Sequence, residues 1–305
     1  MNTTLLSDRA MPHLDGVEHR YLTVRGARFH IAEAGRGEPV VLLHGFPQHW
    51  YAWHKVIPLL AGSYRVICLD LRGFGWSQQT RRGYDTDALG ADVLAVLDAL
   101  GVDRVTLAAH NWGAGVGFRL CQQAPERFRA FLALNMAHPW TPHRAVLPNL
   151  WRMWFTALIE YPVLGRLVLR HWPAFTRYLL RRGPAGPGLW TQAELTEYAE
   201  ATRASAHAGQ SLFWQYVVRD IPAGLRGTHR RRRLTVPTLV LGGELDPVIP
   251  PALLAGDPYA DNLTVRIAPG AGHQLPQERP ELVARSIRDL CQGAPVEDPA
   301  GGSAY

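Results

Sequence analysis

Two side chains in the C-terminal part of the chain have the types and spacing of a general base. Asp246 follows the apolar run 237–243, and His273 follows the next apolar run, 263–270, in a glycine-rich loop. A carboxylate that accepts the Nδ1 proton of a histidine orients the ring and stabilises its protonated form. Glu244 is a second candidate for the acid, and Asp246 is the preferred one.

A third position that could take part in this chemistry is Asn111, within the stretch LAAHNWGAG (107–115). The stretch predicts a strand, a sharp turn and a helix, with the small residues Ala109 and Gly113 two positions to either side of Asn111. Hydrolases place a nucleophile at the tip of such a turn, in a strained backbone conformation that Asn tolerates. Because an amide is a very poor nucleophile, a purely structural turn is the alternative for Asn111 taken alone.

These side chains depend on a predicted sheet for their positions. Apolar runs bounded by turn residues predict strands within 21–35, 39–45, 64–70, 105–110, 131–136, 237–243 and 263–270. Helical patterns lie between several of them, and the one at 86–101 ends at Gly101. This alternation predicts an α/β fold with a mainly parallel central sheet and helices on both faces. In such a sheet Asn111, Asp246 and His273 lie at the same edge.

One long segment interrupts the alternation of strands and helices. It contains no convincing strand and many aromatic residues, so we expect a helical cap inserted into the core. Most of the aromatic side chains should pack the cap against the core, and a few should line a pocket between them. We take Trp140, Trp154 and Phe155 as candidates for substrate binding. The predicted domains are the core (1–137 and 228–291), the cap (138–227) and a disordered tail (292–305).

The composition narrows the classes of partner. The formal charge of +6 comes from arginine, since Lys55 is the only lysine, and no nucleic-acid-binding motif accompanies it. The three cysteines have unrelated spacings, which predicts neither a disulfide framework nor a metal site. No metal or nucleotide motif implies a cofactor. The sequence shows neither a signal peptide nor a stretch long enough to span a bilayer, so we expect a cytoplasmic protein. We expect it to be a monomer or homodimer with no nucleic-acid or membrane partner.

Nearly the whole chain resembles the α/β-hydrolase superfamily, and within it the epoxide hydrolase branch. The resemblance is carried by residues 44–77, 110–140, 242–250 and 270–280. A turn residue, then an acid, then a histidine is the chain order of the superfamily's catalytic triad. In the HGFP motif that begins at His44, the resemblance implies a cis peptide bond before Pro47. It also implies an oxyanion hole formed by the amides of Phe46 and Trp112.

The resemblance implies a two-step mechanism from which this chain departs. An aspartate at the turn opens the epoxide and forms an ester, and the His–Asp pair activates water to hydrolyse that ester. Here Asn111 stands in place of the aspartate. One or two cap tyrosines supply the acid for the departing oxygen, but the first tyrosine position falls at Phe155. Tyr216 is the best candidate for the second, and Tyr161 and Tyr178 are weaker ones.

Three interpretations of Asn111 remain open. The favoured one is an inactivated Asp-to-Asn form of an enzyme that opens an epoxide of a bulky apolar substrate to a vicinal diol. Alternatively, a natural asparagine leaves His273 and Asp246 to act without a covalent intermediate, or the protein is a non-catalytic ligand-binding homologue. A dehalogenase is a further alternative, because Trp112 resembles the halide-binding tryptophan of haloalkane dehalogenases.

Overall fold

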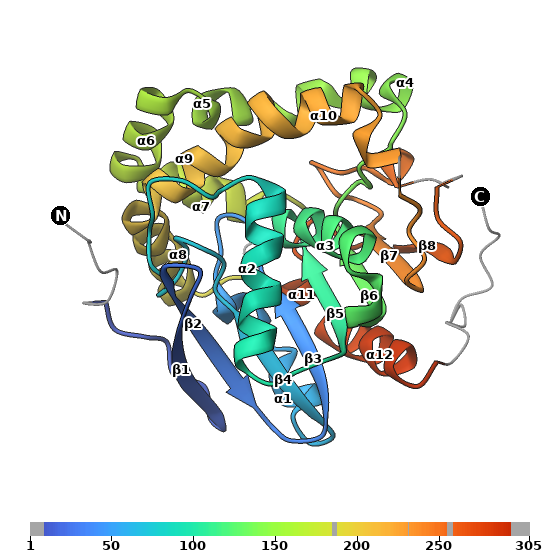
Figure 1. The fold of residues 1–305 in the computed structure, drawn as a ribbon. Coiled ribbons are helices and arrows are strands. Elements are labelled where there is room, and N and C mark those ends of the chain that lie inside the picture. The colour runs from blue at the N-terminus through green and yellow to red at the C-terminus, as the bar shows by residue number, and fades with distance from the viewer. Residues whose placement is uncertain (1–8, 185–187, 231, 255–258, 294–305) are drawn as a thin grey trace.

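The central sheet has eight strands in the order β1-β2-β4-β3-β5-β6-β7-β8 (Figure 1). The computed structural model describes residues 9–184, 188–230, 232–254 and 259–293. The strands are β1 (Val17–Val24), β2 (Ala27–Ala34), β3 (Glu38–Leu43), β4 (Tyr64–Leu69), β5 (Val105–His110), β6 (Phe128–Leu134), β7 (Thr238–Gly243) and β8 (Leu263–Ala268). Strands β3 to β8 pair in parallel, whereas β2 pairs antiparallel with both β1 and β4. The predicted mainly parallel sheet is therefore confirmed.

Helices cover both faces of this sheet. The core helices are α1 (Ile57–Leu60), α2 (Thr86–Ala99), α3 (Trp112–Gln123), α11 (Leu275–Glu278) and α12 (Pro280–Cys291), with short turns η1 (Trp50–Trp53), η2 (Pro125–Arg127), η5 (Thr228–Arg230) and η6 (Pro251–Leu253). Helices α2 and α3 pack on one face, and α1 and α12 on the other. The burial of both faces explains why most residues of the inner strands are apolar.

Side chains alternate between the two faces along the inner strands. In β3, Val41 and Leu43 join the cluster with α2 and α3, whereas Val40 and Leu42 join the cluster with α1 and α12. The two clusters fix the register, since a shift by one residue would exchange the faces. Leu43 pairs with Ala109, and His110 pairs with Leu134, so these strands end level with one another.

The described chain between β6 and β7 contains helices as its regular structure. They are α4 (His143–Val146), η3 (Leu147–Met153), α5 (Thr156–Glu160), α6 (Pro162–His171), α7 (Pro173–Arg181), α8 (Gln192–Ala204), α9 (Ala206–Gln215), η4 (Tyr216–Asp220, a π-helical turn) and α10 (Ile221–Leu225). We call residues 138–227 the helical insertion. It lies over the edge of the sheet toward which β5 points (Figure 1). None of the helices in the described ranges is long and apolar enough to cross a bilayer.

The first predicted strand region is a hairpin in the structure. Strand β1 begins at Val17, before the predicted start, and the turn at Arg25 and Gly26 separates it from β2. Both turn residues have positive φ, 48° and 71°. This backbone matches the twist of a two-residue hairpin, and the glycine allows it. Residues 294–305, most of the predicted tail, lie outside the described residues.

Glycines allow the turn before α3 to approach β3. A Cβ on Gly113 would lie 2.6 Å from the His44 carbonyl oxygen and 2.7 Å from that of Leu43. Those atoms belong to backbone at the end of a central strand, so they cannot move aside easily. Likewise a Cβ on Gly45 would lie 2.5 Å from the Asn111 Cβ. The turn at residue 111 therefore needs glycine at both places.

Gly113→Ala should destabilise the protein, and Gly115→Ala two residues later should not. At Gly115 a Cβ would meet only the flexible end of Met136, at 3.1 Å. We expect Gly113→Ala to lower the free energy of unfolding by about 2 kcal/mol or more, as overpacking against fixed atoms does. Gly115→Ala should change it by less than about 1 kcal/mol, because alanine is the better helix former. Urea unfolding of both variants measures this, and equal losses would contradict the close approach at Gly113.

Two buried histidines hold the loops at this edge of the sheet. His44 Nε2 accepts a hydrogen bond from the Leu71 amide (3.0 Å), and its Nδ1 lies 2.9 Å from the Gly45 carbonyl oxygen. His110 Nε2 donates to the His273 carbonyl oxygen (2.8 Å). Burial lowers the pKa of His44 to about 4 and that of His110 to about 3. Both rings are therefore neutral at neutral pH.

The low pKa of His110 should make the protein acid-sensitive. The unfolded chain binds a proton at this residue near pH 6.5, whereas the folded protein does not until about pH 3. The stability that depends on neutral His110 is thus complete above pH 6.5 and is lost as the pH falls. Between about pH 7 and about pH 5, the free energy of unfolding should lose about 2 kcal/mol from this residue.

His110→Gln tests this cause directly. Glutamine keeps a donor for the His273 carbonyl but does not titrate, so the variant should lose less stability on acidification than the parent. Urea unfolding at the two pH values measures the difference, and identical pH dependence in both proteins would contradict it.

Candidate active site

The carboxyl ends of three parallel strands bring together Asn111, Asp246 and His273. Asn111 follows β5 and precedes α3, Asp246 follows β7, and His273 follows β8. Asn111 has a φ of 52° and a ψ of −121°, a strained conformation for a residue with a side chain. It turns the Asn111 side chain toward the other two residues.

The three side chains form a continuous chain of hydrogen bonds. Asp246 Oδ2 accepts from His273 Nδ1 at 2.7 Å. On the other side of the ring, Asn111 Nδ2 lies 3.0 Å from His273 Nε2. An amide nitrogen only donates, so Nε2 is the acceptor and Nδ1 carries the proton. His273 is thus held in the tautomer that a general base requires, but Asn111 occupies its basic lone pair.

Asp246 is buried and fully hydrogen-bonded. Its Oδ1 accepts from the amides of Val248 (2.7 Å) and Ile249 (2.9 Å), and its Oδ2 also accepts from Asn135 Nδ2 (2.9 Å). Burial by itself would raise the pKa of the Asp246 carboxyl, but His273 and the two amides hold it below its ordinary value. The side chain is therefore a carboxylate at neutral pH. Glu244, the other candidate acid, instead accepts from the Gly270 amide (2.8 Å).

Two residues that position the site were not identified from the sequence. Asn135 has a positive φ of 50°, and its Nδ2 bridges Asp246 and the Gly272 carbonyl oxygen (3.0 Å). Glu278 accepts from the amides of Gly272 (2.6 Å) and Gln274 (2.9 Å), which flank His273. The signals were an asparagine directly after an apolar strand and an acid five residues after the histidine. Neither is specific without knowledge of the spatial neighbours.

The predicted oxyanion donors lie beside residue 111. The Phe46 amide donates to Asn111 Oδ1 at 3.2 Å, and the peptide bond between Phe46 and Pro47 is cis. Trp112 is the first residue of α3, and the first amides of a helix have no partner within the helix. The Phe46 amide thus contacts the side chain of residue 111, the Trp112 amide begins the helix that follows it, and the helix N-terminus favours negative charge there.

Aromatic residues of the insertion lie against the turn. The Trp112 ring contacts Phe213 (4.8 Å between centroids) and Tyr216 (5.1 Å). Tyr216 keeps 37% of its surface exposed. Partial removal from water, and then the Asp220 carboxylate, raise the pKa of its phenol. Tyr216 therefore stays protonated at neutral pH and lies next to the predicted oxyanion donor.

The other predicted insertion residues have different surroundings. Phe155 is buried beneath the Arg182 guanidinium, which lies 4.9 Å from its ring centroid. Trp154 is 48% exposed and contacts Tyr178. Trp140 is buried against Phe118 of α3, in the position of a core side chain. Their role in substrate binding stays a prediction. Tyr161 is exposed at the start of α6.

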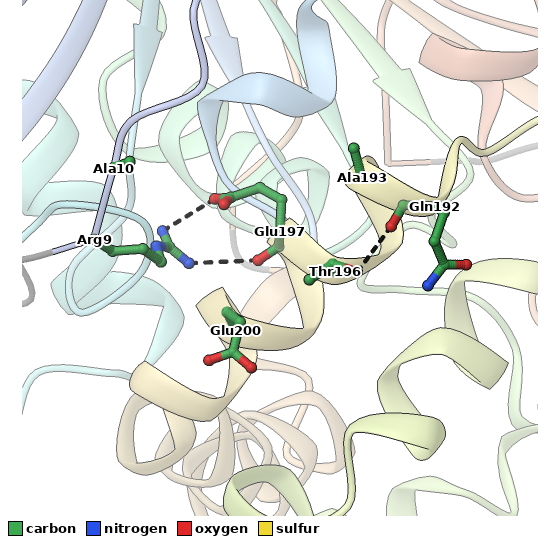
Figure 2. A pocket seen from close by; sticks show the side chains of 7 residues that line it. All are labelled: Arg9, Ala10, Gln192, Ala193, Thr196, Glu197 and Glu200. Atoms are coloured by element: carbon green, nitrogen blue, oxygen red, sulfur yellow. Dashed lines mark hydrogen bonds and ion pairs between the residues drawn. The ribbon is translucent and has the colours of Figure 1, made fainter.

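One cavity at the surface does not contain these residues. It has a volume of about 440 Å³ and lies between the N-terminal segment and α8, where Arg9 and Glu197 form an ion pair of 3.3 Å (Figure 2). A second cavity of about 10 Å³, which could hold one water molecule, lies beside Arg182, Gln274 and Glu278. No group of histidine, cysteine or acidic side chains among the described residues is arranged to hold a metal ion.

Comparisons with known proteins agree with this fold. A family model described as the α/β hydrolase fold matches residues 38–280. The soluble epoxide hydrolase of Corynebacterium sp. (strain C12) is 28% identical, over 88% of this chain and 94% of that protein. The crystal structure of wild-type Cfl2 from Burkholderia cenocepacia has a TM-score of 0.82 and 31% identity, and it covers 92% of this chain and 98% of that one.

A plant enzyme has a similar structure at lower identity. Epoxide hydrolase VrEH1 from Vigna radiata has a TM-score of 0.78 and 25% identity, with 92% of this chain and 100% of that one covered. The strand order, the strand–turn–helix at residue 111 and the similar proteins all indicate the same fold family. The chain belongs to the α/β-hydrolase superfamily, and within it to the epoxide hydrolase branch.

Proposed function

We propose that this fold is built to open an epoxide of a bulky apolar substrate to a vicinal diol, and that Asn111 leaves the chain without its nucleophile. The observation that carries the proposal is the position of the residue 111 side chain. Its two terminal atoms lie 3.2 Å from the Phe46 amide nitrogen and 3.0 Å from His273 Nε2. A carboxylate in this place would have an oxyanion donor on one side and a general base on the other.

The first step would use an aspartate at position 111. Its carboxylate oxygen attacks one epoxide carbon, the carbon–oxygen bond of the ring breaks, and an ester forms between the substrate and residue 111. The departing oxygen takes a proton, for which the phenol of Tyr216 is the candidate donor. Its raised pKa keeps the proton available over the physiological range. Phe155, at the other expected acid position, has no proton to give.

The second step would use His273 and Asp246. His273 Nε2 removes a proton from water, and the oxygen attacks the Cγ of residue 111. The amides of Phe46 and Trp112 stabilise the tetrahedral oxyanion. As it collapses, the departing alkoxide takes the proton from His273 and leaves as the diol, and the acid proton on residue 111 returns to the Tyr216 phenolate, which restores the carboxylate. Asp246 stabilises the imidazolium that forms in this step. Its four hydrogen bonds keep it ionised and in place.

Asn111 prevents the first step and hinders the base. An amide oxygen is a far weaker nucleophile than a carboxylate, and the Asn111 NH₂ group donates to the lone pair that His273 would use on water. Asparagine and aspartate have nearly the same shape, so the exchange leaves the surrounding structure intact. We therefore expect Asn111→Asp to supply the missing function without refolding the site.

Asn111→Asp should turn over epoxides, and the chain with Asn111 should not. We expect an increase in kcat/KM on the order of 10³-fold or more against aryl or alkyl epoxides, since the nucleophile of a covalent mechanism is essential. Mass spectrometry of the Asn111 protein before and after the assay shows whether the residue has remained an amide. Turnover by protein that still carries Asn111 would contradict the proposal and favour direct water activation.

A second change in the Asn111→Asp background separates the two steps. His273→Gln should block hydrolysis of the ester but not its formation, so a covalent substrate adduct on residue 111 should accumulate and be seen by mass spectrometry. An Asn111→Asp, His273→Gln protein that releases diol at the parental rate would contradict the role of His273. Release of halide from haloalkanes by Asn111→Asp, without epoxide turnover, would overturn the epoxide assignment.

Tyr216→Phe in the Asn111→Asp background should slow ring opening on the order of 10²-fold, because the departing oxygen loses its proton donor. Phenylalanine keeps the ring contact with Trp112, so the fold should not change. Tyr178→Phe is the matched control, since Tyr178 contacts Trp154 on the insertion. Single-turnover measurement of adduct formation reports the step, and an equal effect of both changes would remove the assignment of Tyr216.

A further inference from the structure

Exposed large apolar side chains are concentrated in one part of the described chain. Ten of eighteen lie between residues 144 and 182, and each of the ten is 44% to 68% exposed. They come from η3, α6, α7 and the turns beside them, and they include Trp151, Trp154 and Trp172. We call the exposed side chains of residues 144–182 the outer face. Helices α5 and α6 lie at the outer edge of the molecule, away from the sheet (Figure 1).

The contacts of α6 with the rest of the insertion determine which of its apolar side chains face solvent. Leu169 is buried, and Gly165 lies so close to the Ile159 carbonyl oxygen of α5 that a Cβ there would clash with it. The helix therefore cannot rotate without a clash. Val163, Leu164 and Leu167 remain on the opposite side, between 45% and 67% exposed. Their exposure is a stable property of the fold, and a patch of this kind marks an interaction surface.

The same segment carries the positive charge of the protein. Residues 144–182 contain seven arginines and one acidic residue, Glu160, so they account for the entire formal charge of +6. Arg144, Arg166, Arg170 and Arg181 are exposed. None of the seven arginines forms an ion pair with a described acidic residue. The partner of the outer face should therefore be both apolar and anionic.

We propose that the outer face binds the surface of an anionic lipid bilayer. Tryptophan and tyrosine are favoured at the level of the lipid headgroups, leucine and valine reach the upper acyl chains, and arginine pairs with lipid phosphates. The contact is peripheral, because the helices lie along the surface and are too short to span it. This proposal differs from the expectation of no membrane partner, because that expectation rested only on the lack of a membrane-spanning stretch.

The positive charge of the outer face also favours an anionic bilayer over a second copy of the chain or another folded protein. A second copy of the chain would place two faces of the same strong positive charge against each other, which opposes association. A folded protein would need a surface complementary to side chains that project from three separate helical elements. A bilayer accepts such side chains without a complementary shape, and its anionic lipids attract the arginines.

Vesicle sedimentation with the Asn111 chain tests the proposal without an activity assay. Vesicles contain either phosphatidylcholine alone or equal parts of phosphatidylcholine and phosphatidylglycerol. We expect the protein to sediment with the anionic vesicles at least roughly tenfold more than with the neutral ones, and less at high salt. Tryptophan emission should shift to shorter wavelength on binding, as the exposed indoles leave water.

Two pairs of substitutions test the two parts of the outer face. Trp151→Ser with Trp172→Ser, and separately Arg166→Gln with Arg170→Gln, should each reduce the bound fraction roughly fivefold or more. The matched apolar control is Tyr21→Ser with Leu59→Ser, which are 41% and 40% exposed elsewhere. The matched charge control is Arg104→Gln with Arg285→Gln, both exposed on the core. Thermal unfolding checks that every variant remains folded.

Three results would overturn the proposal. The first is equal binding to both kinds of vesicle, or none to either. The second is an equal loss in the control pairs, which would show a general effect of charge or hydrophobicity. The third is a concentration-dependent dimer, measured by analytical ultracentrifugation, that Trp151→Ser with Trp172→Ser abolishes while vesicle binding is absent. That result would assign the outer face to a second copy of the chain.

Discussion

The backbone conformation of residue 111 is the constraint on which the site depends. With a φ of 52°, the residue aims its side chain out of the sheet edge rather than back along β5. That conformation is held because α3 approaches β3 at Gly113 and the loop after β3 approaches Asn111 at Gly45. The strain is offset by packing and hydrogen bonds around the turn. Everything else at the site, from the Phe46 amide to the His273 ring, is placed relative to this one side chain.

The sheet and the order of the site residues could be predicted from the sequence because both depend on local patterns. Buried parallel strands are apolar throughout, and chemistry-bearing residues follow them at the same edge. Asn135 and Glu278 could not be found in this way, because each acts through hydrogen bonds to residues that are distant in the chain or in an irregular loop. The hairpin turn at Arg25 and Gly26 was missed because the short apolar runs on its two sides were taken as one strand region, although the alternation changes phase at the turn.

The helical insertion was the harder part to predict, since aromatic composition does not say which way a side chain points. Trp140 and Trp154 are equally plausible pocket residues in the sequence, yet one is buried on α3 and the other is half exposed. The insertion has two apolar surfaces. One packs on the core beside Trp112, and the other is the outer face. A helical pattern with one apolar stripe predicts the first of these but gives no warning of the second.

The crossing of residues 182–184 over the loop that carries His273 limits how the insertion and the core can move apart. A Cβ on Gly183 would lie 3.9 Å from the His273 backbone nitrogen, and one on Gly272 would lie 2.6 Å from Pro184 Cδ. Separation at this side would drag the histidine away from Asp246 and break the base. Arg182 Nη2 also donates to the Arg152 carbonyl oxygen of η3 (3.0 Å), so η3 is tied to the same crossing. The position of the His273 ring therefore depends on the insertion as well as on the core.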